Sequence, residues 1–358
     1  MPELKERFRA ADRLPARDLW SDISTRVPGS PPPSPVGPRI AAAAVALLIM
    51  LVGIVVAVRA LRPGPPPVVP AGPKANGEIL VYSGPRYAIS TMTTDGSAPA
   101  PVRGLPPRAS LPEWSPDGRR IAFAVTTPGH GEIWVARANG SAAHAVFRCA
   151  DHFDAPTCFR PFTGLTWSPD GKQIAFILGS MYVMNADGTD VRRLYSQDLQ
   201  TVGAPPVWSP DGRTILFVMT TPGPQGAGAE NNLYLAAADG SGIRQLTRCG
   251  PIAYATCAPS WPSWSPDGRT IVFADEVTGS IRTIGVGGGA ITTLLAPPRG
   301  TSYLNPLWSP DGKLILLVGR TGSKSRVLEA NADGTGAHPI SKAGAWFLFS
   351  WQGIPKGA

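Results

Sequence analysis

Five aspartates are the residues most able to do chemistry, because each occupies the same place in a repeated pentapeptide, WSPDG. Carboxylates that a fold gathers together could act as general acids and bases or bind a cation. The order Ser-Pro-Asp-Gly, however, is typical of a type I turn, with proline second and glycine in the left-handed position. We therefore predict turns that join paired strands and lie spread around one face. The repeated residues are Trp114, Asp117 and Gly118; Trp167, Asp170 and Gly171; Trp208, Asp211 and Gly212; Trp264, Asp267 and Gly268; and Trp308, Asp311 and Gly312.

The sequence lacks other signals of catalysis. It contains no GxSxG nucleophile elbow, no HExxH zinc motif and no phosphate-binding loop. Its four histidines are scattered without the spacing of metal ligands. We therefore expect no enzymatic activity, no cofactor and no metal ion.

The four cysteines form two close pairs, Cys149 with Cys158 and Cys249 with Cys257. Both pairs come shortly before a WSPDG copy, at matching places of the repeat. A disulfide across each small loop suits an oxidising compartment. A metal site that borrows a nearby histidine and a set of buried free thiols are the alternatives, but neither pair has the CxxC spacing of zinc sites.

The spacing of the pentapeptides defines a repeat. Successive tryptophans lie 53, 41, 56 and 44 residues apart, and a worn copy, FSW at 349–351, follows 43 residues later. The basic period is thus 41 to 44 residues, and the two longer intervals are the two that contain cysteine pairs. A fixed period of this length is typical of propellers and other repeat folds.

Each period contains the same series of short apolar runs separated by turns. WSPDG is followed by a run such as IAFAV or ILFVM, a variable loop, and a second run such as EIWVA or LYLAA. An Asn-Gly or Asp-Gly turn and a third run complete the unit. With the run that ends at tryptophan, this makes four short strands, which is one propeller blade. A β-sandwich is the alternative all-β arrangement.

Counting the central hairpins predicts six blades over residues 77–352. The first hairpin lacks a preceding tryptophan strand, and the last tryptophan strand, 345–352, lacks a following hairpin. We therefore expect the C-terminal strand to complete the first blade and close the ring, which removes exposed sheet edges. Residues 353–358 are expected to be a tail.

The WSPDG copies, each followed by an I-A-F type strand and a D-G turn, resemble the TolB-type, WD-like β-propeller repeats. The resemblance covers about residues 77–352 and extends to the non-catalytic propellers of prolyl-oligopeptidase-like proteins. It implies a six-bladed propeller that serves as a binding platform and carries no catalytic residues. The N-terminal domain of TolB has no counterpart in this sequence, so the partners of TolB are not implied.

A hydrophobic segment, 40–58, is long enough to cross a membrane. Its 19 residues carry no charge, and at ~1.5 Å per residue they span about the thickness of a hydrocarbon core. Proline-rich linkers at 28–39 and 59–76 flank it as extended spacers. A cleaved signal peptide is the alternative, but the preceding region is long and no clean cleavage site follows.

The distribution of charge argues against a nucleic-acid partner but does not decide the orientation in the membrane. The chain has a net charge of +8, but residues 76–358 hold 23 basic and 20 acidic residues, so we expect no nucleic-acid partner. Lys and Arg near the segment do not decide which side is cytoplasmic. The cysteine pairs do, because disulfides place residues after the segment outside the cytoplasm. We therefore expect a single-pass bacterial membrane protein with a cytoplasmic N-terminus.

The N-terminal segment, 1–27, is predicted to form two short helices that are interrupted at a proline. One face of the second carries Leu19, Trp20, Ile23 and Val27. Such a helix could dock on a cytosolic partner, lie on the membrane surface or remain disordered. The stretch LPARDLWSDI resembles N-terminal segments of actinobacterial membrane proteins associated with sigma-factor control, although the zinc-type anti-sigma pattern is absent.

We expect the ligand-binding face to lie where the repeat is elaborated. Loops between second and third strands share a face with the connections between blades, and functional loops are often the longest. The predicted function is a non-enzymatic, extracytoplasmic module that binds a protein or an envelope ligand. A signalling protein with a regulator at its N-terminus and a hydrolase-related propeller are the alternatives. The candidate ligand residues are His152, Phe153, Tyr254, Trp261 and Tyr303; packing within the loops is the alternative role.

Overall fold

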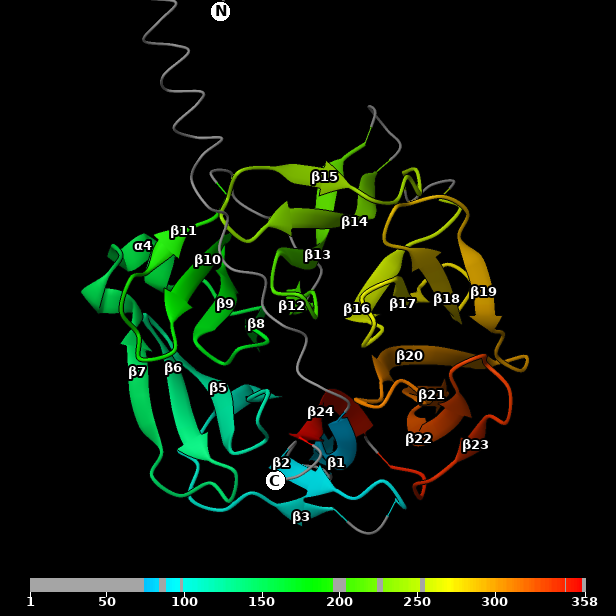
Figure 1. Ribbon diagram of the computed structural model, residues 1–358, viewed down its shortest axis with the longest axis horizontal. Coiled ribbons are helices and arrows are strands. Elements are labelled where there is room, and N and C mark those ends of the chain that lie inside the picture. Colours follow the sequence, from blue (N-terminus) through cyan, green and yellow to red (C-terminus); the bar gives the residue numbers. More distant parts are fainter. Residues whose placement is uncertain are drawn as a thin grey trace, which may run out of the picture. The chain divides into compact units, whose positions relative to one another are not determined.

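The computed structural model describes residues 74–83, 88–96, 99–195, 204–223, 228–251, 255–344 and 346–355. All of them belong to one compact unit, Pro65–Ala358. They form six four-stranded antiparallel sheets set around a common centre, so the predicted six-bladed propeller is confirmed (Figure 1).

The first three blades contain the first eleven strands, the last strand and both short helices. Blade 1 consists of β24 (Trp346–Pro355), β1 (Lys74–Ser83), β2 (Ala88–Met92) and β3 (Ala100–Pro101). Blade 2 consists of β4 (Ala109–Trp114), β5 (Arg120–Thr127), β6 (His130–Arg137) and β7 (His144–Arg148). The 3₁₀ helix η1 (Cys149–Asp151) and helix α4 (Ala155–Cys158) then lead to blade 3, made of β8 (Gly164–Trp167), β9 (Gln173–Leu178), β10 (Ser180–Asn185) and β11 (Arg192–Arg193).

The other three blades repeat the arrangement. Blade 4 consists of β12 (Val207–Trp208), β13 (Thr214–Pro222), β14 (Ala229–Ala237) and β15 (Ile243–Gln245). Blade 5 consists of β16 (Pro259–Trp264), β17 (Thr270–Asp275), β18 (Ser280–Gly285) and β19 (Thr292–Leu295). Blade 6 consists of β20 (Thr301–Trp308), β21 (Leu314–Thr321), β22 (Lys324–Asn331) and β23 (His338–Pro339).

The ring closes through the C-terminal strand, as predicted. Strand β24 is the innermost strand of blade 1 and pairs antiparallel with β1, from Ser83 opposite Trp346 to Lys74 opposite Pro355. Both strands run three residues beyond their predicted limits of 77 and 352. They continue because residues 74–76 and 353–355, expected to be linker and tail, satisfy each other's backbone hydrogen bonds.

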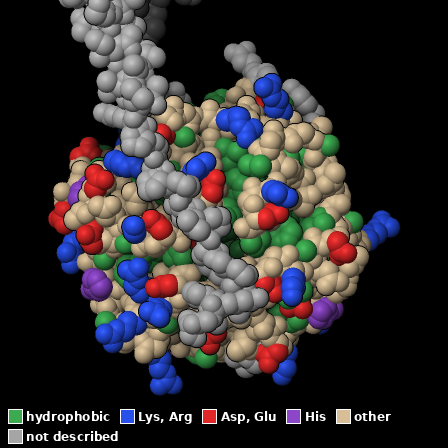
Figure 2. All heavy atoms as spheres, viewed as in Figure 1, with side chains coloured by type: hydrophobic (Ala, Val, Ile, Leu, Met, Phe, Trp, Pro, Cys, Tyr) green, Lys and Arg blue, Asp and Glu red, His purple; other side chains and the backbone are tan. Residues whose placement is uncertain are grey.

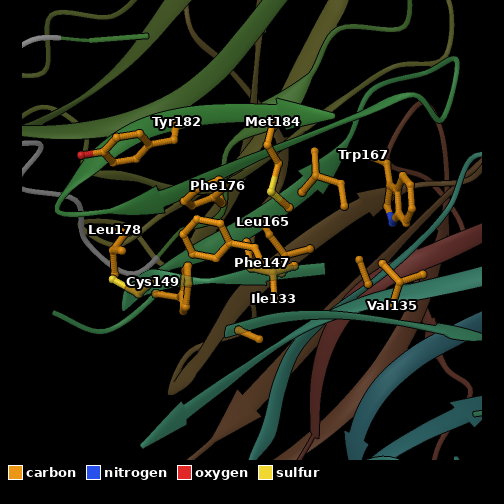
Figure 3. Close-up of a cluster of buried hydrophobic side chains, with 14 of the residues drawn as sticks. Ile133, Val135, Phe147, Cys149, Leu165, Trp167, Phe176, Leu178, Tyr182 and Met184 are labelled. Carbon is orange, nitrogen blue, oxygen red and sulfur yellow. The ribbon is translucent and has the colours of Figure 1, made fainter. Parts of the chain in front are cut away.

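The core lies within and between the blades. The second strand of most blades carries a phenylalanine at the same place, and Phe123, Phe176, Phe217 and Phe273 are all fully buried. Phe176 packs with Phe147 of the preceding blade, at 5.0 Å between ring centroids (Figure 3). Strands buried on both faces explain why the apolar runs show no polar alternation. Burying a side chain of this size contributes about 1.5–3 kcal/mol.

Each WSPDG pentapeptide forms the turn that the sequence predicted. The Ser115 hydroxyl donates to Asp117 at 2.6 Å, the same aspartate accepts the Arg119 N–H at 3.1 Å, and Gly118 N–H donates to the Ser115 carbonyl at 2.8 Å. The other four copies repeat these bonds, and all five glycines are left-handed, with φ between 67° and 75°. The aspartates therefore act as turn architecture.

Acidic and basic side chains are interspersed over the described surface seen in Figure 2. No helix among the described residues is both long and apolar enough to cross a membrane. The predicted hydrophobic span at 40–58, its linkers and the N-terminal residues Leu19, Trp20, Ile23 and Val27 lie outside the residues that the structure describes.

Candidate functional site

Hairpin loops and inter-blade connections come together on one face of the propeller, here called the loop face. A Cβ at Gly129, in the β5–β6 loop, would lie 3.2 Å from the ring of Phe159, which follows α4. Tyr303 N–H donates to the Gly279 carbonyl at 2.7 Å, which joins β20 to the loop between β17 and β18. Phe159 is 67% exposed. The loop face therefore presents elaborated segments from neighbouring blades.

Both predicted disulfides are present and brace loops of this face. They join Cys149 to Cys158 and Cys249 to Cys257. Each lies between the last strand of one blade and the first strand of the next, in the two longest repeats, so each closes an inserted connection as the sequence predicted.

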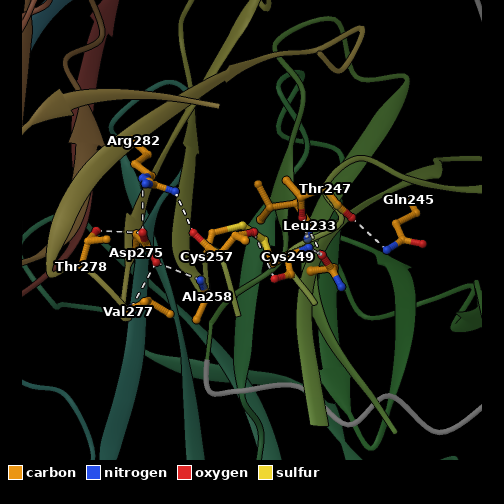
Figure 4. The surroundings of a disulfide bond; sticks show 12 residues. Leu233, Gln245, Thr247, Cys249, Cys257, Ala258, Asp275, Val277, Thr278 and Arg282 are labelled. Atoms are coloured by element: carbon orange, nitrogen blue, oxygen red, sulfur yellow. Dashed lines mark hydrogen bonds and ion pairs between the residues drawn. A yellow bond between two sulfur atoms is a disulfide. The ribbon is translucent and has the colours of Figure 1, made fainter. Parts of the chain in front are cut away.

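The second disulfide loop is anchored by a buried carboxylate, Asp275 (Figure 4). This side chain is fully buried and accepts the Ala258 N–H at 2.8 Å, directly after the disulfide. It also forms an ion pair with Arg282 at 3.2 Å, and Arg282 in turn donates to the Thr256 carbonyl. One charge pair therefore ties the loop to β17 and β18.

The structure does not gather the predicted ligand residues into one site. His152 stacks on Phe147 of blade 2 at 5.1 Å and remains exposed, whereas Phe153 is half-buried and lies 4.8 Å from Tyr182 of blade 3. Tyr303 is only 7% exposed and belongs to the core between blades 5 and 6. Tyr254 lies outside the described residues. Trp261 lines the central channel.

A channel runs along the propeller axis, lined by the innermost strands and the WSPDG turns. It has two adjoining sections, of about 850 Å³ and 160 Å³, which share six lining residues. The wider section is bordered by the WSPDG turns and the narrower one by the innermost strands. The residue before the last tryptophan of each innermost strand lines the narrow section: Glu113, Thr166, Val207, Ser263, Leu307 and Ser350.

Three innermost strands contain a bulge with left-handed backbone, and two of these bulges line the narrow section. Leu111, Trp261 and Asn305 have φ of 53°, 50° and 50°, and each directly precedes a proline. The strand pairing is irregular at the same three places. Left-handed backbone costs about 1–3 kcal/mol for a non-glycine residue and persists where surrounding structure imposes it. These bulges redirect side chains at the channel wall.

An aromatic contact crosses the channel at this level. Trp261 of blade 5 meets Phe347 of blade 1 with ring centroids 4.6 Å apart, although blade 6 lies between them in the ring. Phe347 packs on Phe349 at 5.0 Å, and Phe349 packs on Tyr82 at 4.3 Å. Asn305 supports the crossing by donating to the Leu348 carbonyl at 3.2 Å. The narrow section is thus bounded by apolar and aromatic groups.

Glu113 is the one ionisable side chain among the six equivalent channel positions. Burial raises the pKa of its carboxyl to about 8, and a hydrogen bond with the Ser350 hydroxyl offsets only part of this. Its remaining accessible surface faces the channel. Desolvation therefore keeps Glu113 protonated at neutral pH. Perturbed groups of this kind in a cavity are candidates for a functional role.

Several indole N–H groups at the channel have no partner. Trp114, Trp167 and Trp208 line the wide section and are 4%, 3% and 6% exposed, and their Nε1 atoms form no hydrogen bond among the described residues. The equivalent Trp264 donates to the Val207 carbonyl at 3.2 Å, at the channel wall of the preceding blade. These Nε1 atoms have almost no accessible surface, because the indole rings pack in the apolar clusters between blades, so they are buried donors without a partner among the described residues.

Sequence reasoning missed Glu113, although a signal for it exists. Aligning the six tryptophan strands on their tryptophan shows Glu, Thr, Val, Ser, Leu and Ser in the preceding position. One charge in a column of neutral residues departs from the repeat, and such departures are where a repeat protein acquires specific chemistry.

Comparison with known proteins agrees with this architecture. The family described as the TolB beta propeller domain matches residues 81–226 and 166–345, which is most of the chain. The chain belongs to this TolB β-propeller family.

Curated relatives match only in part. The Tol-Pal system protein TolB of Anaeromyxobacter dehalogenans is 33% identical over 90 residues, 24% of this chain and 18% of that protein. The uncharacterized peptidase YuxL of Bacillus subtilis is 31% identical over 101 residues, 27% of this chain and 15% of its own.

The chain thus spans less than a fifth of the length of these relatives. Solved structures share its fold at low identity. TolB from Acinetobacter baumannii has a TM-score of 0.57 and 18% identity, covering 78% of this chain and 67% of that one. The nidogen/laminin complex contains a chain with a TM-score of 0.57 and 12% identity, covering 77% and 98%. An oligogalacturonate lyase in complex with manganese has a TM-score of 0.50 and 13% identity, covering 75% and 72%.

Proposed function

We propose that this TolB-family propeller is a non-enzymatic, membrane-anchored module that binds a protein or envelope ligand outside the cytoplasm. The loop face is the main support, because both disulfides brace elaborated connections on it. Disulfides of this kind suit an oxidising compartment. A rigid scaffold that presents variable loops is the common arrangement of binding proteins.

The place where the chain enters the propeller would let the loop face point away from a membrane anchor. Lys74 begins β1 opposite Pro355, and Asn76 accepts the Asp311 N–H of a WSPDG turn at 3.2 Å. The chain therefore enters the propeller on the face that carries the WSPDG turns, here called the turn face, which lies opposite the loop face. A proline-rich linker over 59–73 would extend by about 3.1 Å per residue, which is room for a partner to approach.

Thiol labelling tests the membrane topology. A cysteine placed at Ser241, in an exposed turn of the propeller, should react with a membrane-impermeant maleimide in intact cells. The matched variant Ser24→Cys, on the predicted cytoplasmic side, should react only after lysis. The opposite pattern would place the propeller in the cytoplasm and end this proposal.

Site-specific crosslinking tests the binding face. A photoreactive benzoylphenylalanine at position 159 is expected to give a discrete adduct in intact cells, because Phe159 protrudes from the loop face. The same group at Lys172, exposed on the turn face, serves as the control. Equal adducts from both positions, or none from 159, would contradict the assignment of the loop face.

The hydrolase-related alternative has one specific observation in its favour, the partial similarity to the peptidase YuxL. Labelling of the purified full-length chain by a serine-hydrolase activity probe would support it. The signalling alternative needs a specific cytosolic partner of residues 1–39, which a pull-down with that segment measures.

A further inference from the structure

The central channel has a one-sided electrostatic character. Glu113, Asp267 and Asp311 line it, whereas no lysine, arginine or histidine belongs to the described residues of either section. The Ser265 hydroxyl and the Arg269 N–H, which both donate to Asp267, lower the pKa of that carboxyl. Ionised carboxylates therefore border the wide section, and a low-dielectric cavity lined by one sign of charge attracts the opposite sign.

Glu113 lies in the narrow section among hydroxyl groups that retain acceptor capacity. Ser350 Oγ accepts the Trp114 N–H at 3.1 Å, and Ser263 Oγ accepts the Trp308 N–H at 3.2 Å. A hydroxyl oxygen has two lone pairs, so each serine can accept one more donor. Glu113 and Ser350 come from adjacent blades and are hydrogen-bonded to each other, and Ser263 lies at the equivalent position of the opposite blade, so acceptors surround one level of the channel.

The walls around these acceptors are apolar. Trp261, Pro262, Pro306, Leu348 and Phe349 border the narrow section. An aliphatic stem can bury its methylene groups against such a surface while its charged end reaches the carboxylate. Aromatic faces also attract cations.

We propose that the channel binds a primary ammonium group carried on a slender alkyl chain, with Glu113 as its counter-ion. The ammonium donates to Glu113 and to the hydroxyls of Ser263 and Ser350, and its stem packs on the aromatic and proline walls. A lysine side chain of a bound polypeptide and a free diamine both offer this chemistry.

Other cations fit the channel less well. A metal ion needs several convergent oxygen or nitrogen ligands, and the part of the chain that the structure describes contains no group of three or more His, Cys, Asp or Glu able to hold one. A guanidinium is planar and needs bidentate partners, whereas one carboxylate flanked by hydroxyls suits the compact, three-donor ammonium.

Calorimetric titration of the full-length chain tests the site. The probes are Nα-acetyl-lysine amide and 1,5-diaminopentane, with Nα-acetyl-norleucine amide as the uncharged control. Binding of either amine at about pH 7 should release close to one proton, because the pair holds Glu113 ionised; the release should fall toward zero well above its pKa. The other titratable groups near the channel and strand β24 are Asp267, Asp311 and Tyr82. None is expected to change protonation between pH 7 and 9, because the pKa values of the two aspartates are lowered and that of the tyrosine is raised.

Variants separate the proposed site from other binding. Glu113→Gln should weaken amine binding at least tenfold at high pH and abolish proton release. Glu276→Gln, the same change at an exposed glutamate, should leave both unchanged. The relative affinity of the two probes identifies the source of the ammonium. Absence of binding by either amine, binding of the norleucine control, or binding that survives Glu113→Gln without loss would each overturn the proposal.

Discussion

The protonation state of Glu113 makes the stability of the propeller depend on pH in a defined direction. Burial raises its pKa from 4.5 to about 8. The folded protein therefore keeps a proton that the unfolded chain releases, and the unfolding free energy falls as pH rises through this window. At ~1.4 kcal/mol per pH unit, the full window corresponds to about 5 kcal/mol. Water entering the channel would screen the charge, so this is a ceiling.

Glu113→Gln removes this dependence, because the amide is neutral and nearly the same shape. The variant and the wild type should have similar unfolding free energies near pH 4.5. Above about pH 8 the variant should be the more stable by several kcal/mol. Urea unfolding followed by tryptophan fluorescence, at a series of pH values with the disulfides intact, measures the difference.

Glu276→Gln is the control for the loss of a glutamate as such. This exposed side chain should give a curve parallel to that of the wild type. The reasoning fails if Glu113→Gln also runs parallel to the wild type between pH 5 and 9, or if it is the less stable protein throughout that range.

Three further predictions concern the parts that hold the loop face and the ring together. Deleting residues 345–358 leaves β1 as an exposed edge and removes the buried Leu348 and Trp351, so the melting temperature should fall steeply. Deletion of 356–358 alone is the control and should not change the melting temperature. Equal melting temperatures of the two deletion variants would refute ring closure. Asp275→Ala leaves Arg282 without its counter-ion and should cost about 3–5 kcal/mol in urea unfolding; a loss under ~1 kcal/mol would show that the pair is dispensable. Replacing Cys149 and Cys158 together by alanine opens a loop with a sequence separation of 9 and should lower the free energy of unfolding by about 2–3 kcal/mol. An unchanged melting temperature under non-reducing conditions would mean that the packing of Phe147 alone holds the loop.

The sequence carries enough local information for the propeller because the repeat is built from short-range rules. The order Ser-Pro-Asp-Gly specifies a turn through proline's fixed φ and glycine's access to the left-handed region, and all five turns form as predicted. The period and the orphaned C-terminal strand predict six blades and their closure, since an unpaired edge would be unfavourable. Two stretched intervals with paired cysteines predict both disulfides.

Only the tertiary structure shows where the loop aromatics lie. His152 and Phe153 are ligand candidates in the sequence; in the structure they contact Phe147 and Tyr182 from other strands, and only His152 remains exposed. Trp261 comes to the channel because a bulge turns it inward, toward Phe347 at the far end of the chain. Packing between residues this distant in sequence depends on closure of the ring.

Glu113 shows most clearly which properties the sequence determines and which depend on the tertiary structure. Its identity and its departure from the repeat are present in the sequence, but its pKa is not, because desolvation depends on the six innermost strands converging around it. Sequence alone determines the repeat, the turns and the disulfide pairs, each of which follows from neighbouring residues or from their period. Only the closed ring decides that a single glutamate among neutral equivalents becomes a half-buried, desolvated acid that faces a channel without basic groups among its described lining residues.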